Sequence, residues 1–167
     1  TLYRTGAASP IVDHLVTAAR SGKEVTVVIE LMARFDEAEN ISLANRLQEA
    51  GAHVVYGLVG FKTHAKMTLV VRREDDRLKR YVHLGTGNYH YATTSVYTDY
   101  GYLSSSQKLG EDVHKLFLQL TSLTKVSGMT RMLASPFTLF DALIEKIERE
   151  KSNAEAGLDA LIIAKIN

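Results

Sequence analysis

The sequence predicts an α/β fold with a mixed, mainly parallel sheet that is flanked by helices. Two observations lead to this prediction. Short runs rich in valine and isoleucine alternate with helix-like runs over the first 60 residues or so, which is the pattern of βαβαβ units. The chain has 167 residues, of which 46% are hydrophobic, so it is long enough to bury one core.

The first half of the chain contains five expected elements. In order, they are the end of a strand at 1–5, a helix at about 10–20, a buried strand at 24–32, a helix at about 39–50 and a strand at 53–58. Ser9 and Pro10 provide an N-cap and a first-turn proline for the first helix, and Gly51 ends the second. This order predicts parallel strands joined by helical crossovers.

The second half adds a hairpin and two helices. We expect strands at 64–74 and 77–85, helices at 107–123 and about 138–156, and a short linker at 126–135. Asp75 and Asp76 form a polar turn between the two strands, which predicts an antiparallel hairpin added to the sheet. Both ends of the chain fall in strand-like runs, so we expect a fragment of a longer protein.

Charge and composition exclude several classes of function. The chain has 20 basic and 19 acidic residues, so general binding to nucleic acid or to a membrane surface is not indicated. It has no cysteine, which excludes disulfides, thiol catalysis and cysteine zinc sites. No apolar run approaches the roughly 18 residues needed to span a bilayer. We expect a cytoplasmic protein, with membrane association of a full-length complex left open.

His64 and Lys66 are the first candidates for chemistry. They stand two residues apart in a predicted strand and therefore share one face. A neutral imidazole can attack phosphorus, and a nearby ammonium can stabilise the phosphoryl oxygens. The alternative is that both are solvated polar residues at the start of a strand.

A glycine-rich turn, Gly85-Thr86-Gly87-Asn88, follows one hairpin later. Glycines allow backbone N–H groups to converge on an anion, and Asn88 can donate an amide hydrogen bond. The alternative is an ordinary turn after a strand. His83 lies near this turn and could support the site.

The H-x-K pair and the later Asn88 resemble the pattern of the phospholipase D superfamily, whose members use a histidine as a phosphoryl nucleophile. The aspartate expected five residues after the lysine is Val71 here. A longer set of motifs resembles polyphosphate kinase of the phosphohistidine type, and specifically the first of its two C-terminal catalytic domains. These motifs are TLYRT, GKEVTVVIELMARFDEAENI, GLVGFKTHAKM, YVHLGTGNYH and SVYTDYG, in this order and spacing.

The resemblance implies a phospholipase D-like fold and a set of site residues. His64 corresponds to the histidine that takes the terminal phosphate of ATP, Arg4 and Arg34 to arginines at the phosphate and magnesium site, and Tyr97 to a tyrosine at the nucleotide site. Lys66 and Asn88 would help to bind phosphate. Both arginines follow predicted parallel strands, at the edge where open α/β sheets bind ligands. Alternatively, Arg34 pairs with an acidic residue of an exposed loop, and Arg4 is a solvated chain end.

The resemblance also implies an activity, which is reversible transfer of the ATP γ-phosphate to polyphosphate through phosphohistidine at His64. Its cofactor is Mg²⁺, its partners are ATP, ADP and inorganic polyphosphate but no nucleic acid, and we expect a homo-oligomer. It divides the chain into a catalytic domain (1–125), a linker and helix (126–157) and the truncated start of a second catalytic domain (158–167). The isolated fragment is expected to be inactive, because only part of the active site is present.

Two other classes of function remain open. The first is a phosphodiesterase or transphosphatidylase of the phospholipase D type, in which two H-x-K motifs meet across an interface. The second is a non-catalytic domain that binds polyphosphate or ATP.

The apolar residues 161–167 predict an exposed strand edge that favours self-association.

Overall fold

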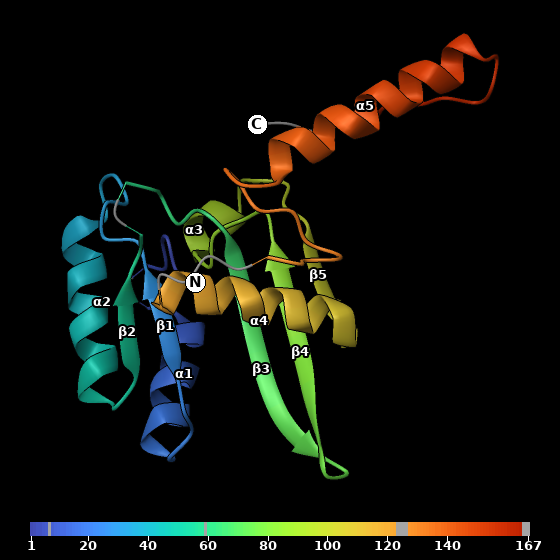
Figure 1. Cartoon of the computed structure of the whole chain (residues 1–167). Helices are drawn as coiled ribbons and strands as arrows, with labels where there is room; N and C mark the ends of the chain where they lie inside the picture. Colours follow the sequence, from blue (N-terminus) through green and yellow to red (C-terminus); the bar gives the residue numbers. More distant parts are fainter. Residues whose placement is uncertain (7, 59, 123–126, 165–167) are drawn as a thin grey trace. The chain divides into compact units, whose positions relative to one another are not determined.

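The computed structural model describes residues 1–6, 8–58, 60–122 and 127–164. Helices and strands are mixed along the chain, as Figure 1 shows, so the predicted α/β class is confirmed. The chain divides into two compact units, residues 1–130 and 131–167. None of the helices in the described residues combines the length and hydropathy needed to cross a membrane.

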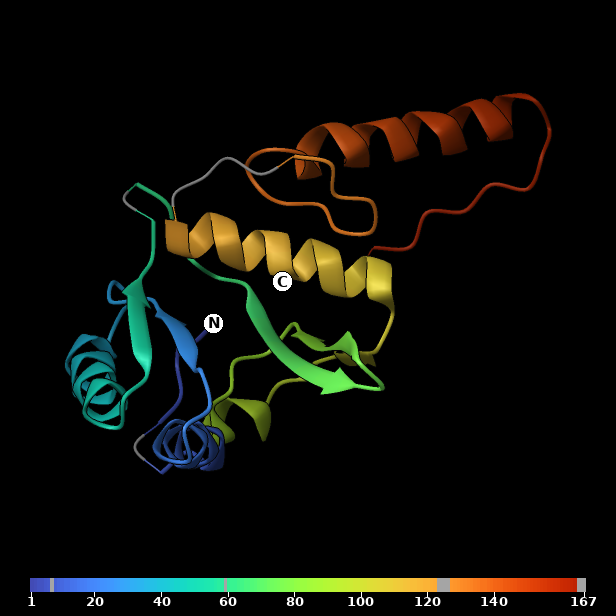
Figure 2. The same ribbon diagram turned by 60° about the horizontal axis from the view of Figure 1, so that its bottom comes forward.

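The parallel part of the first unit consists of β1 (Thr26–Ile29) and β2 (His53–Tyr56). Leu2 forms a further parallel bridge to Ile29. Helices α1 (Pro10–Arg20) and α2 (Glu37–Glu49) pack on one side of these strands (Figure 2).

The core of this part joins both helices to the strands. Its most buried members include Val12 of α1, Leu47 of α2 and Ile29 of β1. The predicted start of α1 is confirmed, although the Ser9 side chain forms no capping hydrogen bond.

The antiparallel part consists of β3 (Lys66–Glu74), β4 (Arg77–Gly85) and β5 (Gly101–Ser104), in that spatial order. The predicted hairpin is confirmed, and its turn residues Asp75 and Asp76 have φ values of 48° and 59°, as a type I′ turn requires.

Helix α4 (Gln107–Ser122) packs against β3 and β4. It lies on the side of the strands opposite to α1 and α2 (Figure 2). The approach is close at Gly110, where an added Cβ would lie 2.6 Å from the Cβ of Arg80. A glycine is therefore required at this point of α4.

The prediction of a mixed, mainly parallel sheet holds only in part. Three strands pair antiparallel, whereas the parallel part is one two-stranded pair with one bridge. Alternation along a strand indicates which side chains are buried, but it does not indicate the direction of the neighbouring strand. The antiparallel strand β5 was not predicted, because it is only four residues long and gives a weak pattern.

The start of the chain connects the two sets of strands. Leu2 donates its N–H to Val28 O at 2.8 Å, while Met67 donates its N–H to Thr1 Oγ1 at 3.1 Å. Thr1 and Leu2 therefore lie between β1 and β3, directly before the residues that form the candidate site.

The second unit contains α5 (Leu139–Glu155). An exposed strand edge was expected at 161–167. Residues 161–164 form no strand, so the expectation is wrong for them. Residues 165–167 lie outside the described residues. A short apolar run lacks the alternation that distinguishes a strand from a loop. The proposed self-association through this edge stays a prediction.

Candidate active site

His64 and Lys66 are in contact at the start of β3. Lys66 is the first residue of the strand and is only 5% exposed, whereas His64 is exposed in the preceding loop. The Nζ atom of Lys66 lies 3.0 Å from Nε2 and 3.2 Å from Nδ1 of His64. The predicted proximity of the two side chains is confirmed, although His64 lies before the strand and not in it. The alternative of two solvated residues does not describe the buried lysine.

The electrostatic surroundings favour a neutral imidazole. Although His64 is exposed, its ring is partly desolvated, and this lowers the pKa of His64 below its ordinary value of 6.5. The positive charges of Lys66 and Lys62 lower the pKa further. Burial also lowers the pKa of Lys66, with Asp99 opposing this shift and Arg4 adding to it. A neutral His64 keeps a lone pair that can accept a hydrogen bond from Lys66 or attack an electrophile.

Tyr3 connects the histidine with two cationic side chains. Its ring meets the His64 ring edge-on, with centroids 4.9 Å apart and an interplanar angle of 79°. Lys66 Nζ lies 5.5 Å and the Arg4 guanidinium carbon 5.9 Å from the centroid of the Tyr3 ring. The face of an aromatic ring attracts cations, so Tyr3 helps to collect positive charge beside His64.

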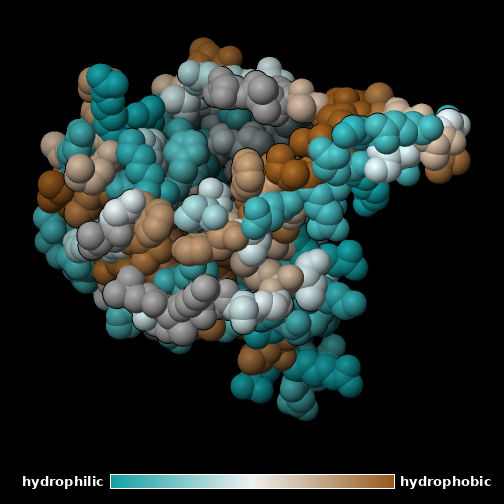
Figure 3. Space-filling view, turned by 45° about the horizontal axis from the view of Figure 1, so that its top comes forward, coloured by the Kyte–Doolittle hydropathy of each residue, from teal (hydrophilic) through white to brown (hydrophobic). Residues whose placement is uncertain are grey.

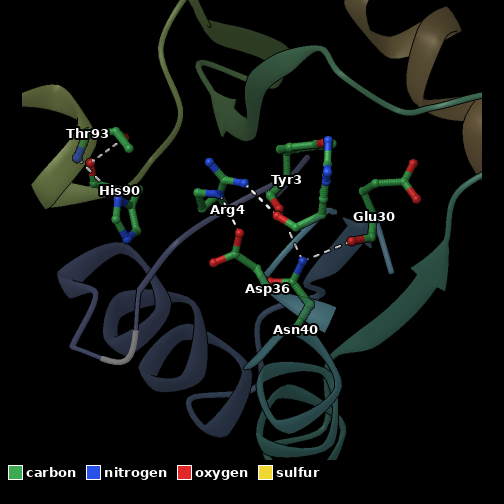
Figure 4. Close-up of polar contacts among 8 residues, drawn as sticks. Tyr3, Arg4, Glu30, Asp36, Asn40, His90 and Thr93 are labelled. Carbon is green, nitrogen blue, oxygen red and sulfur yellow. Dashed lines mark hydrogen bonds and ion pairs between the residues drawn. The ribbon is translucent and has the colours of Figure 1, made fainter. Parts of the chain in front are cut away.

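Arg4 is held in place by the loop that follows β1. Its Nε donates to the Asp36 carboxylate, and its Nη2 donates to Arg34 O at 2.8 Å (Figure 4). Asp36 therefore pairs with Arg4 and not with Arg34. The alternative of a solvated chain end is wrong for Arg4, because its guanidinium is fixed at two points.

The side chain of Arg34 is exposed and lies over the ring of Phe35, with the guanidinium carbon 4.9 Å from the ring centroid. The structure thus brings Arg4 to the backbone of Arg34. Among the described residues, it records no contact between the Arg34 guanidinium and His64.

Two buried polar residues that the sequence analysis missed hold the strand ends together (Figure 4). Asn40, on the first turn of α2, is 1% exposed and donates to Tyr3 O at 3.1 Å and to Glu30 O at 2.9 Å. Glu30 is 5% exposed and accepts the N–H groups of Met32 at 3.0 Å and of Thr63 at 2.7 Å.

The peptide nitrogen of Thr63 lies one residue before His64. Glu30 therefore fixes the loop that carries the histidine, while Asn40 fixes the segment that carries Tyr3 and Arg4. The available sequence signal was a glutamate inside the buried strand predicted at 24–32, since a buried carboxylate needs hydrogen-bond donors.

The glycine-rich turn is built around Asp99. Thr86 donates its hydroxyl to Asp99 Oδ1 at 2.9 Å, and a Cβ added to Gly87 would lie 2.2 Å from Asp99 Oδ2. The Thr86 N–H is bonded to Tyr100 O at 3.0 Å, so this amide is not free to bind an anion. The Oδ1 atom of Asn88 is buried and has no hydrogen-bond partner among the described residues, which makes it available to a donor group.

His83 lies beside this turn, as expected. A Cβ added to Gly85 would lie 3.3 Å from Cε1 of His83. A Cβ added to Gly101 would lie 3.0 Å from Nε2 of the same ring. Its Nδ1 is 2.8 Å from the hydroxyl of Tyr89, which is 3.0 Å from Thr68 Oγ1. Burial raises the pKa of Tyr89, so the phenol remains a neutral hydrogen-bonding group.

Tyr97 lies in an exposed segment after the short helix α3 (Tyr91–Thr94), which His90 caps by accepting the Thr93 N–H at 3.2 Å. Tyr97 is 60% exposed and its backbone N–H is bound to Thr93 O at 3.1 Å. The structure records no contact between Tyr97 and His64 in the described residues. An exposed ring of this kind is available to stack on a base.

No cluster of typical metal-binding side chains is found among the described residues. No group of three His, Cys, Asp or Glu side chains comes together within them. Arg4 and Arg34 carry positive charge and have no acceptor atom in the side chain, so they cannot bind a cation themselves. Their chemistry fits the oxygens of a phosphate instead.

The sequence of the chain is similar to that of known proteins. The family described as polyphosphate kinase C-terminal domain 1 matches residues 1–127. The whole chain is 58% identical to polyphosphate kinase of Xylella fastidiosa, 59% identical to that of Pseudomonas aeruginosa and 54% identical to that of Neisseria meningitidis, and covers 24% of each relative.

The fold is similar to a solved structure as well. The crystal structure of polyphosphate kinase from Porphyromonas gingivalis matches with a TM-score of 0.80 and 34% identity, over 93% of this chain and 26% of that chain. The present chain thus spans about a quarter of the length of the relatives it matches. Since the family match covers most of the chain and agrees with the similarity in structure, the chain belongs to the polyphosphate kinase family, in which it corresponds to the first C-terminal domain.

Proposed function

We propose that this chain carries the phosphoryl acceptor of a polyphosphate kinase active site, with His64 as the acceptor. The observation that supports this most directly is the contact of the Lys66 ammonium with both ring nitrogens of His64. It places a positive charge beside a neutral nucleophile, where the oxygens of an incoming phosphoryl group would carry negative charge.

The proposed reaction has two steps. A ring nitrogen of His64 attacks the γ-phosphorus of ATP, and the bond from this phosphorus to the bridging oxygen breaks, so that ADP leaves with the electron pair. A terminal oxygen of a polyphosphate chain then attacks the phosphohistidine, the N–P bond breaks, and the chain is one phosphate longer. The reverse sequence forms ATP from ADP and polyphosphate.

The other site residues have proposed roles that follow from their chemistry. The planar guanidinium groups of Arg4 and Arg34 would bind phosphate oxygens in pairs, and Lys66 would balance charge on the transferred group. Asn88 would bind phosphate through its amide, and Tyr97 would contact the nucleotide. Asp36 holds Arg4 ready for this task, which reduces the cost of ordering it when a ligand binds.

We propose that Mg²⁺ arrives with the nucleotide substrate, because this ion is usually held by substrate phosphates, water and only one or two carboxylates. The proposed partners are ATP, ADP and inorganic polyphosphate, and the proposed location is the cytoplasm. A homo-oligomer is proposed as well, as the family resemblance implies. The relatives are longer than this chain. We propose that the corresponding remaining domains of the full-length enzyme complete the site.

Labelling with γ-³²P-ATP tests the proposal. The full-length enzyme should take up label that is stable in base and labile in acid, as a phosphoramidate is, and should release it to ADP or to polyphosphate. The same preparation should leave a phosphodiester intact. Cleavage of the diester would favour the phospholipase D type of function, and absence of label with normal ATP binding would favour a non-catalytic domain.

A further inference from the structure

The loop after β1 contains a residue whose backbone conformation does not suit its side chain. Asp36 donates its N–H to Ala33 O at 3.0 Å, which closes a four-residue turn, and Phe35, the third residue of this turn, has a φ of 75°. This position of a type II turn favours glycine or asparagine. A positive φ is an outlier for a bulky residue such as phenylalanine.

Packing into the core does not explain the phenylalanine, because Phe35 is 84% exposed. The turn itself has a clear use, since it directs Arg34 O and the Asp36 carboxylate toward the guanidinium of Arg4. Glycine would adopt the same backbone with less strain. The feature that needs an explanation is therefore the ring.

The ring lies against the guanidinium of Arg34. The guanidinium carbon is 4.9 Å from the centroid of the Phe35 ring, within the range of a cation–π contact. This is the only ring contact recorded for Phe35 within the part of the chain that the structure describes. Strained backbone of this kind is retained most often at functional sites.

We propose that Phe35 is a positioning residue for Arg34. Its ring holds the guanidinium at the loop that also fixes Arg4, so that both planar groups are ordered before a triphosphate binds. This inference rests on the proposed phosphate-binding role of Arg34. In this proposal, one turn at 33–36 orients both arginines: its backbone orients Arg4, and the ring of Phe35 orients Arg34.

Equilibrium binding of a nonhydrolysable ATP analogue with an imido β–γ bridge tests this inference in the full-length enzyme. Phe35→Leu keeps the strained backbone without the aromatic face, Phe35→Gly removes both, and Phe35→Tyr keeps the face. The first two variants should bind the analogue about two- to fivefold more weakly, the change that an exposed cation–π contact is worth. Phe35→Tyr should bind it like the unmodified enzyme.

Hydrogen exchange at the Asp36 amide separates positioning from a general loss of structure. Phe35→Leu and Phe35→Gly should retain the protection of this amide, because neither removes the hydrogen bond that closes the turn. Asp76→Gly is the matched control, since it relieves a positive φ of 59° at the hairpin turn and should leave binding unchanged.

Three results would overturn the inference: normal binding by Phe35→Leu, binding by Phe35→Tyr as weak as that of Phe35→Leu, or weak binding accompanied by lost protection at Asp36.

Arg34→Ala distinguishes a failure of the inference about Phe35 from a failure of the proposed function. If Arg34→Ala binds the analogue normally, the proposed role of Arg34 is wrong. If it binds weakly while Phe35→Leu binds normally, only the present inference is wrong.

Discussion

Two regions of the first unit are rich in polar and charged side chains, but they hold them in different ways. At the strand ends, Glu30 and Asn40 are almost fully buried and bind backbone groups 33 and 37 residues away in sequence. At the β3–β4 hairpin, Glu74 pairs with Arg72 at 3.4 Å and with Lys79 at 3.1 Å, all within eight positions of one another. Most of the residues at this hairpin tip are hydrophilic, with some hydrophobic surface between them, at the bottom of Figure 3.

The two kinds of polar contact differ in how strongly they are expected to fix the backbone. A buried polar group that loses its partner carries a large penalty, so buried contacts between distant segments fix the backbone that bears His64 and Arg4. Exposed ion pairs are screened by water and contribute little. The same types of residue are therefore expected to respond differently to mutation in the two regions.

The largest effect is expected at the arginines of the strand ends. Arg4→Ala or Arg34→Ala in the full-length enzyme should each cost roughly 2 to 4 kcal/mol of transition-state stabilisation, measured as the loss of kcat/KM for ATP. Lysine should rescue only in part, because it lacks the planar fork.

Arg46→Ala is the matched control for the arginines, since the ion pair of Arg46 with Asp13 is exposed on both sides. It should leave kcat/KM unchanged. Normal turnover by Arg4→Ala would remove Arg4 from the proposed site.

A somewhat smaller effect is expected at Asn40. Its replacement by alanine leaves two carbonyl oxygens, of Tyr3 and Glu30, without the amide that binds them. The free energy of unfolding of this chain in urea should fall by about 2 to 3 kcal/mol. Asn45→Ala, at an exposed position of the same helix, should change it by less than about 0.5 kcal/mol. Equal effects of the two substitutions would contradict the account of the strand ends.

The charge of Lys66 should be visible in the pH dependence of the reaction. Imidazolium has no lone pair for attack, so kcat/KM should fall as the pH drops through the lowered pKa of His64. Lys66→Met removes a positive charge that lowers this pKa, and the acidic limb should therefore move to higher pH. The pKa of His64 should not return fully to its ordinary value, since desolvation is the larger cause of the lowered pKa and remains in this variant. A limb that stays in place or moves to lower pH would show that Lys66 does not act on His64 through its charge.

The smallest effect is expected at the hairpin. Lys79→Ala removes an ion pair with Glu74 that lies at the surface. Neither the urea midpoint nor kcat/KM should change beyond experimental error. A loss of activity in this variant would mean that the hairpin belongs to the functional surface of the longer enzyme.

The sequence was sufficient for the local elements and for part of the site. Ser9 and Pro10 located the start of α1, and the spacing of His64 and Lys66 placed them on one face. These features depend on residues that are close in sequence.

The missed features depend on contacts between distant segments. No periodic signal in the sequence reveals the pairing of β5 with β4, the hydrogen bonds of Asn40 to two strand ends or the bond from Thr63 to Glu30. Arg4 and Arg34 were placed near a magnesium site only through the family resemblance, and a guanidinium has no acceptor atom with which to bind a metal.

The position of the phosphate after reaction with ATP tests the central claim most directly. The full-length enzyme is treated with γ-³²P-ATP, digested under alkaline conditions that preserve phosphohistidine, and its peptides are sequenced by mass spectrometry. We predict phosphate on the peptide that contains His64, and none on this peptide in His64→Ala. Phosphate on His83 or His90, with His64 unmodified, would contradict the account.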